Sequence, residues 1–329
     1  MLENAALADI PAFRCAHAQN AAAGTGCTVI VAPEGAVCGV DVRGGGPATR
    51  ETDLLKPENM VQLVHAVVLS GGSAFGLEAS CGVMDALSER GIGFELAGAH
   101  VPIVTGACLF DLLVGENAHP DKAMGRAAAE AALGEGAGHA LAEGNVGAGT
   151  GASVGKMLGG DDAMKTGFGM AGMRWGDLVC VALVAVNALG HVIGPDGRQI
   201  AGTRDGAGGI ADPLETFERA MAAQAQASAA DKPVANTTIG CILTNARLTK
   251  AQATKTASCV HDAYARAIKP VHTLNDGDTI FALASGQVEA DPDAVSILAT
   301  EAMQQAIVRA ATQAESAYGL PAAKDYGTC

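Results

Sequence analysis

The sequence has 329 residues, of which 49% are hydrophobic and 17% are charged, so the chain can bury a large core and lacks the composition of a disordered protein. Its 43 glycines follow no three-residue period, which excludes collagen, and no uninterrupted apolar run is long enough to span a membrane. The net charge of −14 repels phosphate backbones and anionic lipid surfaces, so we expect neither a nucleic acid nor a membrane as a partner.

The first part of the chain predicts strands separated by glycine-containing turns, followed by a helix. Two short strands over 27–32 and 36–42 flank a Pro-Glu-Gly turn signal and predict a hairpin. A strand over 67–69 leads into Ser70-Gly71-Gly72-Ser73, and apolar residues at helical spacing then predict a helix over 74–90. This order of strand, glycine turn and helix leaves free N–H groups at the start of the helix.

The middle of the chain combines a helix, a glycine-rich loop and a strongly apolar strand. The helix is expected over 122–133, the loop over 144–160, and the strand over 178–186, which is apolar enough to be covered on both faces. From 193 to 235 the residues Gly, Asp, Pro and Ala dominate. We expect a surface linker there, with one helical piece over 213–225.

The last part of the chain alternates strands with two longer helices. A strand is predicted over 237–244, Thr249 is expected to cap a helix that runs to about residue 267, a further strand covers 279–284, and a long helix covers 293–317. The whole order shows no steady βαβ alternation and no internal repeat. It favours a single α/β (α+β) domain over 1–329, in which helices cover sheets from outside.

Cysteine and histidine usage gives no sign of a bound metal. The nine cysteines form no C-x-x-C pair, and the eight histidines lack the spacing of metal ligands. We therefore expect reduced, buried thiols, and neither a metal site nor a cofactor. The acidic N-terminal segment lacks the basic and apolar regions of a signal peptide, which indicates a cytoplasmic location.

Two glycine-rich segments resemble known motifs but fail their patterns. The segment 151–157 ends in Met157, where a P-loop requires Ser or Thr. The segment 71–76 carries Phe75, where a nucleophile elbow requires Gly. We therefore expect neither nucleotide binding nor an elbow serine.

Asn236 and Thr237 lie where the Ala- and Gly-rich segment meets an apolar strand. A threonine hydroxyl is a poor nucleophile without a base, but a Thr that becomes the first residue of a chain gains one in its own α-amino group. Cleavage of the bond between Asn236 and Thr237 would create that arrangement. Taken alone, a β-branched residue here is usually just part of the strand.

Two acidic residues, Asp276 and Asp278, come directly before the strand over 279–284. Residues i and i+2 share a face in extended geometry, so both carboxylates could point the same way. A turn with two solvated acids has the same sequence. Only a wider pattern can decide between the two interpretations.

Such a pattern extends over most of the chain. The sequence resembles the self-processing N-terminal-nucleophile hydrolases of the family that contains L-aminopeptidase/D-amidase-esterases and β-aminopeptidases. Within that family it is also similar to the 6-aminohexanoate (nylon) oligomer endohydrolases. The combination of Asn-Thr-Thr-Ile at 236–239 with Asp-Gly-Asp-Thr-Ile-Phe-Ala at 276–282 is specific, whereas each piece alone is weak. Further matching segments are 40–45, 69–78, 120–128, 147–156, 186–187 and 236–246.

The resemblance implies a four-layer αββα sandwich and a role for each of five residues. Thr237 would be the nucleophile of both self-cleavage and turnover. Asn187 would donate an amide N–H to the oxyanion, and Lys156 would help to set the protonation of the Thr237 hydroxyl. Asp276 and Asp278 would orient the amine and hydroxyl of that threonine.

Self-cleavage is expected to give fragments 1–236 and 237–329, which the resemblance predicts to assemble as a homo-oligomer of processed heterodimers. The substrate would be a short peptide or a β-, ω- or D-amino-acid amide. We expect it to contact a set of residues on glycine-rich turns: Gly72, Ser73, Phe75 and Gly149. Some relatives carry Tyr at the place of Phe75, with a hydroxyl near the reacting carbonyl. Phe75 has no hydroxyl, so we expect no additional oxyanion donor there.

Alternative functions stay open on the sequence alone. Hydrolysis of nylon oligomers is one alternative within the hydrolase class. An acyl-threonine could instead pass its acyl group to an amine, as in ornithine acetyltransferases, which expose a self-generated N-terminal Thr on a related fold. A non-catalytic binding protein could also keep this fold.

Overall fold

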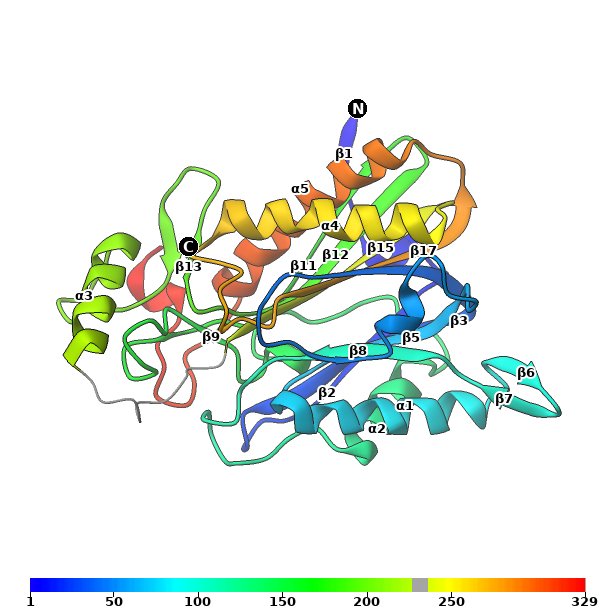
Figure 1. The fold of residues 1–329 in the computed structure, drawn as a ribbon, viewed down its shortest axis with the longest axis horizontal. Helices are drawn as coiled ribbons and strands as arrows, with labels where there is room; N and C mark the ends of the chain where they lie inside the picture. The colour runs from blue at the N-terminus through cyan, green and yellow to red at the C-terminus, as the bar shows by residue number, and fades with distance from the viewer. Residues whose placement is uncertain (227–235, 329) are drawn as a thin grey trace.

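The computed structural model describes residues 1–226 and 236–328 (Figure 1). Ten strands form a continuous sheet that folds into two stacked layers, and a pair of helices covers the outer face of each layer. The four covering helices are α4 (Lys250–Ala267) with α5 (Pro292–Thr312), and α1 (Ala79–Ser88) with α2 (Lys122–Ala132). This is the αββα order of layers that the resemblance implies.

Strand β3 (Thr25–Val42) joins the two layers. Its first part pairs with β2 (Arg14–Asn20) and β5 (Val64–Ser70), and its last part pairs with β17 (Thr279–Val288) in the other layer. The predicted hairpin over 27–42 is therefore wrong. The Pro-Glu-Gly signal marks an irregularity inside one long strand, where the pairing register shifts between Val31 and Ala36 and Gly35 adopts a φ of +78°. A glycine tolerates this left-handed backbone, and the strand can pass from one layer to the other there.

The layer under α4 and α5 has the strand order β1-β11-β12-β15-β17-β3. Its further strands are β1 (Leu2–Ala5), β11 (Phe168–Trp175), β12 (Leu178–Asn187), β15 (Thr237–Ala246) and β17 (Thr279–Val288). The neighbours β15 and β17 are parallel, so their starts meet at the same edge. Every residue of β12 and β15 is buried, as expected for strands that are covered on both faces.

The layer above α1 and α2 continues from β3 through β5 and β8 to β4, with β2 on the other side of β3. Its further strands are β2 (Arg14–Asn20), β5 (Val64–Ser70), β8 (Val104–Cys108) and β4 (Ala48–Arg50). The expected helix over 74–90 begins as a 3₁₀-helix at Ser73–Glu78 and becomes α1 afterwards. Gly72 precedes it with a φ of +81°, which gives the tight turn predicted for this position.

Smaller elements surround the sandwich. They are the pairs β6 (Phe94–Leu96) with β7 (Ala99–Val101) and β9 (Ser153–Val154) with β10 (Met164–Lys165), the three strands β13 (His191–Ile193), β14 (Gln199–Ala201) and β16 (Ile268–Lys269), and helix α3 (Pro213–Gln226). The structure differs from the expected surface linker over 193–235 at the start of that segment. Ile200 and Ala201 of β14 are buried and pack against the core. Helix α3 corresponds to the expected helical piece, and residues 227–235 lie outside the described residues.

The two long helices follow their predicted patterns at the start. Thr249 caps α4 by accepting a hydrogen bond from the Gln252 N–H, while the Gln252 side chain accepts from the Thr249 N–H at 2.8 Å. Helix α5 ends at Thr312, before the expected 317. The chain turns there and Glu315 donates its N–H to Asn145 Oδ1 at 3.1 Å.

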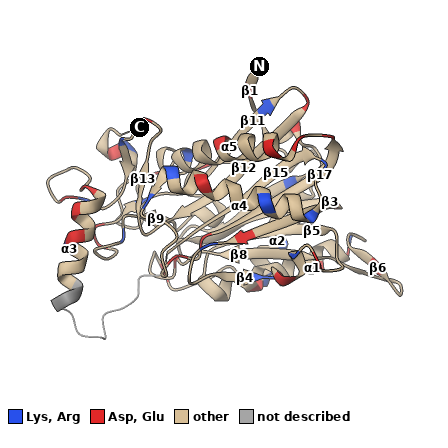
Figure 2. Cartoon of the chain, turned by 45° about the horizontal axis from the view of Figure 1, so that its top comes forward, with Lys and Arg blue, Asp and Glu red and all other residues tan. Residues whose placement is uncertain are grey.

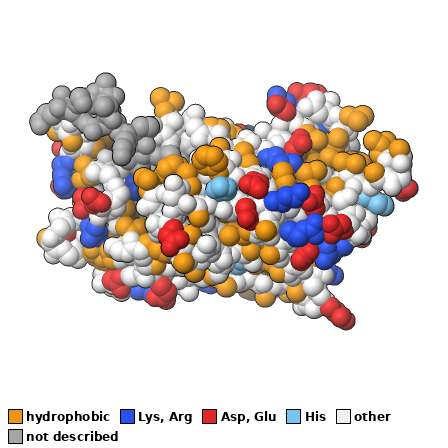
Figure 3. Space-filling model, turned by 90° about the horizontal axis from the view of Figure 1, so that it is seen from below, with side chains coloured by type: hydrophobic (Ala, Val, Ile, Leu, Met, Phe, Trp, Pro, Cys, Tyr) orange, Lys and Arg blue, Asp and Glu red, His pale blue; other side chains and the backbone are white. Residues whose placement is uncertain are grey.

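Charged side chains of both signs are distributed over helices and loops (Figure 2). The face formed by α1 and α2 mixes acidic and basic groups (Figure 3), including an ion pair of 2.6 Å between Lys122 Nζ and Asp85 Oδ2. Within residues 1–226 and 236–328, none of the helices has both the length and the apolar character needed to cross a membrane.

Candidate active site

The starts of β15 and β17 and the end of β12 bring the predicted catalytic residues together. Thr237 is the first residue of β15 and pairs in register with Asn187, the last residue of β12. Asn236 forms a parallel bridge with Asp276, just before β17. All of these side chains are at least 96% buried, because this edge lies inside the molecule rather than at its surface.

The peptide bond before Thr237 is held on its carbonyl side. The Thr237 hydroxyl donates a hydrogen bond to the Asn236 carbonyl oxygen. The Gly277 N–H donates to the same oxygen at 2.9 Å. A Cβ at residue 277 would lie 2.6 Å from Thr237 Oγ1, so only glycine leaves room for the hydroxyl.

The two aspartates accept hydrogen bonds from residues around Thr237. Asp278 accepts from the Thr238 N–H through Oδ1 at 2.8 Å and bonds the His272 ring through Oδ2 at 2.8 Å. Asp276 accepts from both the N–H and the hydroxyl of Thr273, at 2.8 and 2.7 Å. Burial raises the pKa of Asp276, and the nearby charge of Asp278 raises it further.

Lys156 and Asn187 form a second group beside the same edge. The Lys156 ammonium donates to Asn187 Oδ1 at 2.8 Å and to the Asn187 main-chain oxygen at 3.1 Å. Asn187 Oδ1 also accepts from the Ser153 N–H, and Nδ2 donates to the Phe110 carbonyl at 2.9 Å. Burial lowers the pKa of Lys156 to about 7, although the charges of Asp276 and Asp111 act in the opposite direction. This amine can therefore lose or gain a proton near neutral pH.

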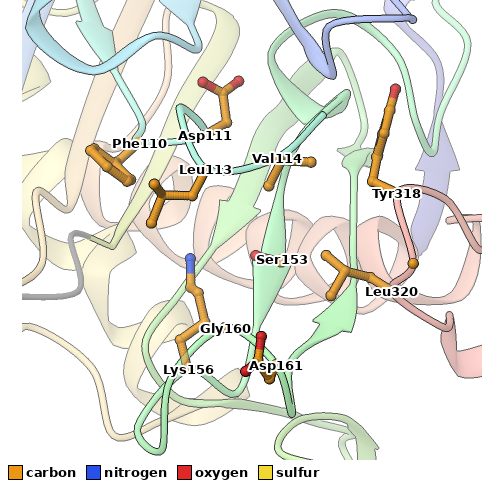
Figure 4. A pocket seen from close by; sticks show the side chains of 11 residues that line it. Phe110, Asp111, Leu113, Val114, Ser153, Lys156, Gly160, Asp161, Tyr318 and Leu320 are labelled. Atoms are coloured by element: carbon orange, nitrogen blue, oxygen red, sulfur yellow. The ribbon is translucent and has the colours of Figure 1, made fainter. Parts of the chain in front are cut away.

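A cavity of about 420 Å³ adjoins Lys156 (Figure 4). Polar groups on its wall come from Ser153, Asp161 and Tyr318, and apolar ones from Leu113 and Leu320. Such a mixture of apolar walls with a few polar groups is typical of small-molecule sites.

The sequence analysis did not identify Asp111, which also lines this cavity. Its carboxylate accepts from the Gly72 N–H at 2.6 Å and from the Thr25 hydroxyl at 2.8 Å. Burial raises its pKa to about 6, while those hydrogen bonds act against the increase. Asp111 lies three residues beyond the end of β8, a strand that the sequence analysis did not predict, so no local pattern pointed to this acid.

The four expected substrate contacts do not line this cavity. Gly72 reaches it only through its bond to Asp111. Ser73 donates its N–H to the Leu109 carbonyl, and Gly149 is buried. Phe75 is 65% exposed and stacks on the His119 ring at 5.4 Å.

Two aromatic residues, Phe110 and Tyr318, line the cavity instead, and the Phe110 carbonyl also accepts a hydrogen bond from the Asn187 amide.

Lys165 is a further buried cation that the sequence analysis missed. Its ammonium donates to three main-chain carbonyls, those of Gly149, Ala152 and Thr166. It thereby supports the glycine-rich loop that carries Ser153 and Lys156. In the part of the chain that the structure describes, no group of three or more His, Cys, Asp or Glu side chains could hold a metal ion.

Comparisons with known proteins identify the family of the chain. A sequence model of the family described as Peptidase family S58 matches residues 5–323. An uncharacterized aminopeptidase of Mycobacterium tuberculosis is 38% identical over an aligned length of 347 residues, which covers 97% of each chain. A 6-aminohexanoate-oligomer endohydrolase of Paenarthrobacter ureafaciens is 34% identical, with 92% of this chain and 84% of the relative covered.

Two solved structures resemble the fold. The L-aminopeptidase D-Ala-esterase/amidase of Ochrobactrum anthropi, described as a new variant among the Ntn hydrolase fold, has a TM-score of 0.67 at 18% identity and covers 98% of this chain and 92% of its own. A β-aminopeptidase of a Burkholderia species has a TM-score of 0.64 at 22% identity, covering 93% and 85%. At these identities the likeness concerns the fold alone, and it confirms the expected sandwich.

Proposed function

The chain belongs to peptidase family S58 and is thus a hydrolase of peptide or amide bonds, and from that premise we propose that Thr237 is its nucleophile, released by self-cleavage. The observation that carries the proposal is the contact of the Thr237 hydroxyl with the carbonyl of Asn236. The nucleophile and the bond to be cut are already neighbours, which removes most of the entropic cost of bringing them together.

Self-cleavage would proceed through an ester. Thr237 Oγ1 attacks the Asn236 carbonyl carbon, its proton passes to the leaving main-chain nitrogen, and the C–N bond breaks. The Asn236 acyl group is then held on the threonine oxygen. Water hydrolyses this ester, which leaves a carboxylate on Asn236 and a free α-amine on Thr237. The Gly277 N–H supports this step, because it already points at the oxygen on which negative charge develops.

Lys156 is the proposed base for the first step. Before cleavage the nitrogen of Thr237 belongs to a peptide bond, so the threonine has no amine of its own. A buried amine with a pKa of about 7 that is anchored to Asn187, the register partner of Thr237, suits this role. After cleavage the α-amine of Thr237 can act as the base for turnover.

The remaining predicted residues would serve turnover. The Asn187 amide has two N–H groups, of which one bonds Phe110; the other has no hydrogen-bond partner among the described residues and would serve an oxyanion. Asp276 and Asp278 would orient the new amine through the segments they hold. The cavity beside Lys156 has room for the acyl part of a short peptide or of a β-, ω- or D-amino-acid amide. Assembly as a homo-oligomer of processed heterodimers and a cytoplasmic location stay predictions.

Hydrolysis of 6-aminohexanoate oligomers is the second candidate function. It is favoured by the 34% identity to the Paenarthrobacter endohydrolase over 92% of this chain. Rates on L-alanine p-nitroanilide, β-alanine p-nitroanilide and 6-aminohexanoate oligomers would rank the two substrate classes. Addition of an amine acceptor would detect acyl transfer as a product other than the free acid.

The nucleophile is tested by the purified full-length chain and its Thr237→Ala variant. The unmodified chain should give fragments of 236 and 93 residues on a denaturing gel, the smaller one beginning at Thr237. The variant should remain whole and inactive. An unmodified chain that stays uncut and inactive would favour a binding protein, and a variant that still turns over substrate would require another nucleophile.

A further inference from the structure

A two-residue turn before β17 holds both aspartates of the candidate site. His272 makes two hydrogen bonds to Asp278 Oδ2, one from its main-chain N–H at 3.1 Å and one from ring Nδ1 at 2.8 Å. Thr273 approaches Asp276 in the same manner, with its N–H and its hydroxyl. Each acid therefore receives one main-chain and one side-chain donor from this turn.

We infer that His272 is a positioning residue for the Thr237 nucleophile, acting through Asp278; the inference rests on the proposed function. The hydrogen bonds run from the His272 ring to Asp278 Oδ2, and from Asp278 Oδ1 to the N–H of Thr238. Thr238 follows the nucleophile directly on β15. A carboxylate fixed at both oxygens thus fixes the peptide plane from which the Thr237 hydroxyl projects.

The His272 ring makes its hydrogen bond to Asp278 and has no other among the described residues, where Nε2 is without a partner. An ionised carboxylate only accepts, so Nδ1 carries the proton of this bond. Ring contacts fix its plane, with centroids 4.7 Å from His261 and 6.0 Å from Tyr264. The ring is thus held in place by packing and directed at a single acceptor.

The backbone at this position is also unusual. His272 has a φ of +58°, in the left-handed region that is unfavourable for most side chains and less so for His and Asn. The same conformation allows the main-chain N–H and ring Nδ1 to reach one carboxylate oxygen. A residue held in such a backbone conformation within a catalytic centre is a candidate for function.

The backbone preference supplies a matched set of variants. His272→Asn tolerates the left-handed region and keeps a side-chain N–H close to the position of Nδ1. His272→Gly tolerates the same backbone and removes the side-chain donor while keeping the main-chain N–H. His100→Asn and His100→Gly, on the peripheral strand β7, control for the substitutions themselves.

The readouts are the rate at which the 93-residue fragment appears in the full-length protein, and kcat and KM of the processed protein for L-alanine p-nitroanilide. Loss of a charge-assisted hydrogen bond should slow self-cleavage and kcat by about ten-fold or more in His272→Gly, with KM within about two-fold. His272→Asn should restore both rates to within about three-fold of the unmodified chain.

Equal rates in the Gly and Asn variants would overturn the inference. If His272→Gly fails to fold, His272→Asp replaces it. Aspartate matches Asn in size, but its negative charge would repel that of Asp278. The Asp variant must then be slower than the Asn variant by about ten-fold, and equality again refutes the role. Thr237→Ala separates the two proposals. Cleavage in that variant would refute the assignment of Thr237 as nucleophile. If Thr237→Ala is inert and His272→Gly is fully active, only the positioning role of His272 is refuted.

Discussion

The N–H of Gly277 lies 2.9 Å from the carbonyl oxygen of Asn236, on the same atom that the Thr237 hydroxyl contacts. Gly277, which follows Asp276, thus binds the carbonyl of the peptide bond that precedes Thr237. The parallel pairing of β15 with β17 produces this relationship, because it aligns the segments that precede both strands. The site is therefore assembled from two segments that are about forty residues apart in sequence.

Gly277→Ala should slow self-cleavage by about ten-fold or more, since a 1 Å displacement of a reacting group can reduce a rate a hundred-fold. The added Cβ would lie 2.6 Å from Thr237 Oγ1, so the hydroxyl must move. The time course of fragment formation measures the effect. Gly134→Ala is the control, because its Cβ would meet its neighbours at 3.4 Å or more. Equal time courses for the two variants would contradict the assigned geometry.

Self-cleavage should accelerate as the pH rises through about 7. Burial lowers the pKa of Lys156 to about 7, so the neutral amine that can accept a proton is present above this pH and is lost below it. Protein purified near pH 5.5 should stay largely uncut, and its cleavage rate can be followed after transfer to a series of buffers.

Lys156→Arg provides the matched variant for this pH dependence. Arginine keeps the positive charge but does not deprotonate in proteins, so the general-base contribution of about a hundred-fold or more should disappear. A flat profile between pH 5.5 and 8.5 in the unmodified chain, or normal cleavage in the variant, would exclude Lys156 as the base.

Asn187→Asp should lower kcat of the processed enzyme by about a hundred-fold or more, the effect of losing an oxyanion donor. The new carboxylate cannot donate, and it would face the Phe110 carbonyl that now accepts from Nδ2. Steady-state kinetics with L-alanine p-nitroanilide measure the loss. Asn245→Asp is the control at the opposite end of the same strand pair, where the amide bonds Val179 and Asp177. If both variants lose activity equally, the role of Asn187 is structural.

Lys165→Met should destabilise the fold by about 3 kcal/mol or more, because the buried Thr166 carbonyl would lose its Lys165 donor and the carbonyls of Gly149 and Ala152 would each keep only a main-chain donor. Urea denaturation of the Thr237→Ala background, which should remain one chain, measures the loss. Lys255→Met, at an exposed position of α4, should change stability by less than about 0.5 kcal/mol. Comparable stabilities of the two variants would show that Lys165 is dispensable for the loop.

Local sequence patterns were sufficient for elements whose stabilisation is local. Thr249 as the cap predicted the start of α4, and the continuous apolar run of β12 predicted a strand buried on both faces. The combination of two short motifs was enough to recognise the family. It also singled out Thr237, Asp276 and Asp278, which the structure places at one edge of the sheet.

Other features depend on contacts between distant segments, and no local pattern encodes them. The Pro-Glu-Gly segment predicted a turn, but it lies inside the single strand β3. Strands of both layers pair with the two ends of β3 and keep the strand continuous. The turn at His272, the buried Asp111 and the position of Phe110 emerged only from packing. Burial then lowered the pKa of Lys156, since a charge loses its hydration when other segments cover it. Short-range hydrogen bonding and hydrophobic periodicity thus account for the elements, whereas desolvation and strand pairing across the chain create the chemistry of the site.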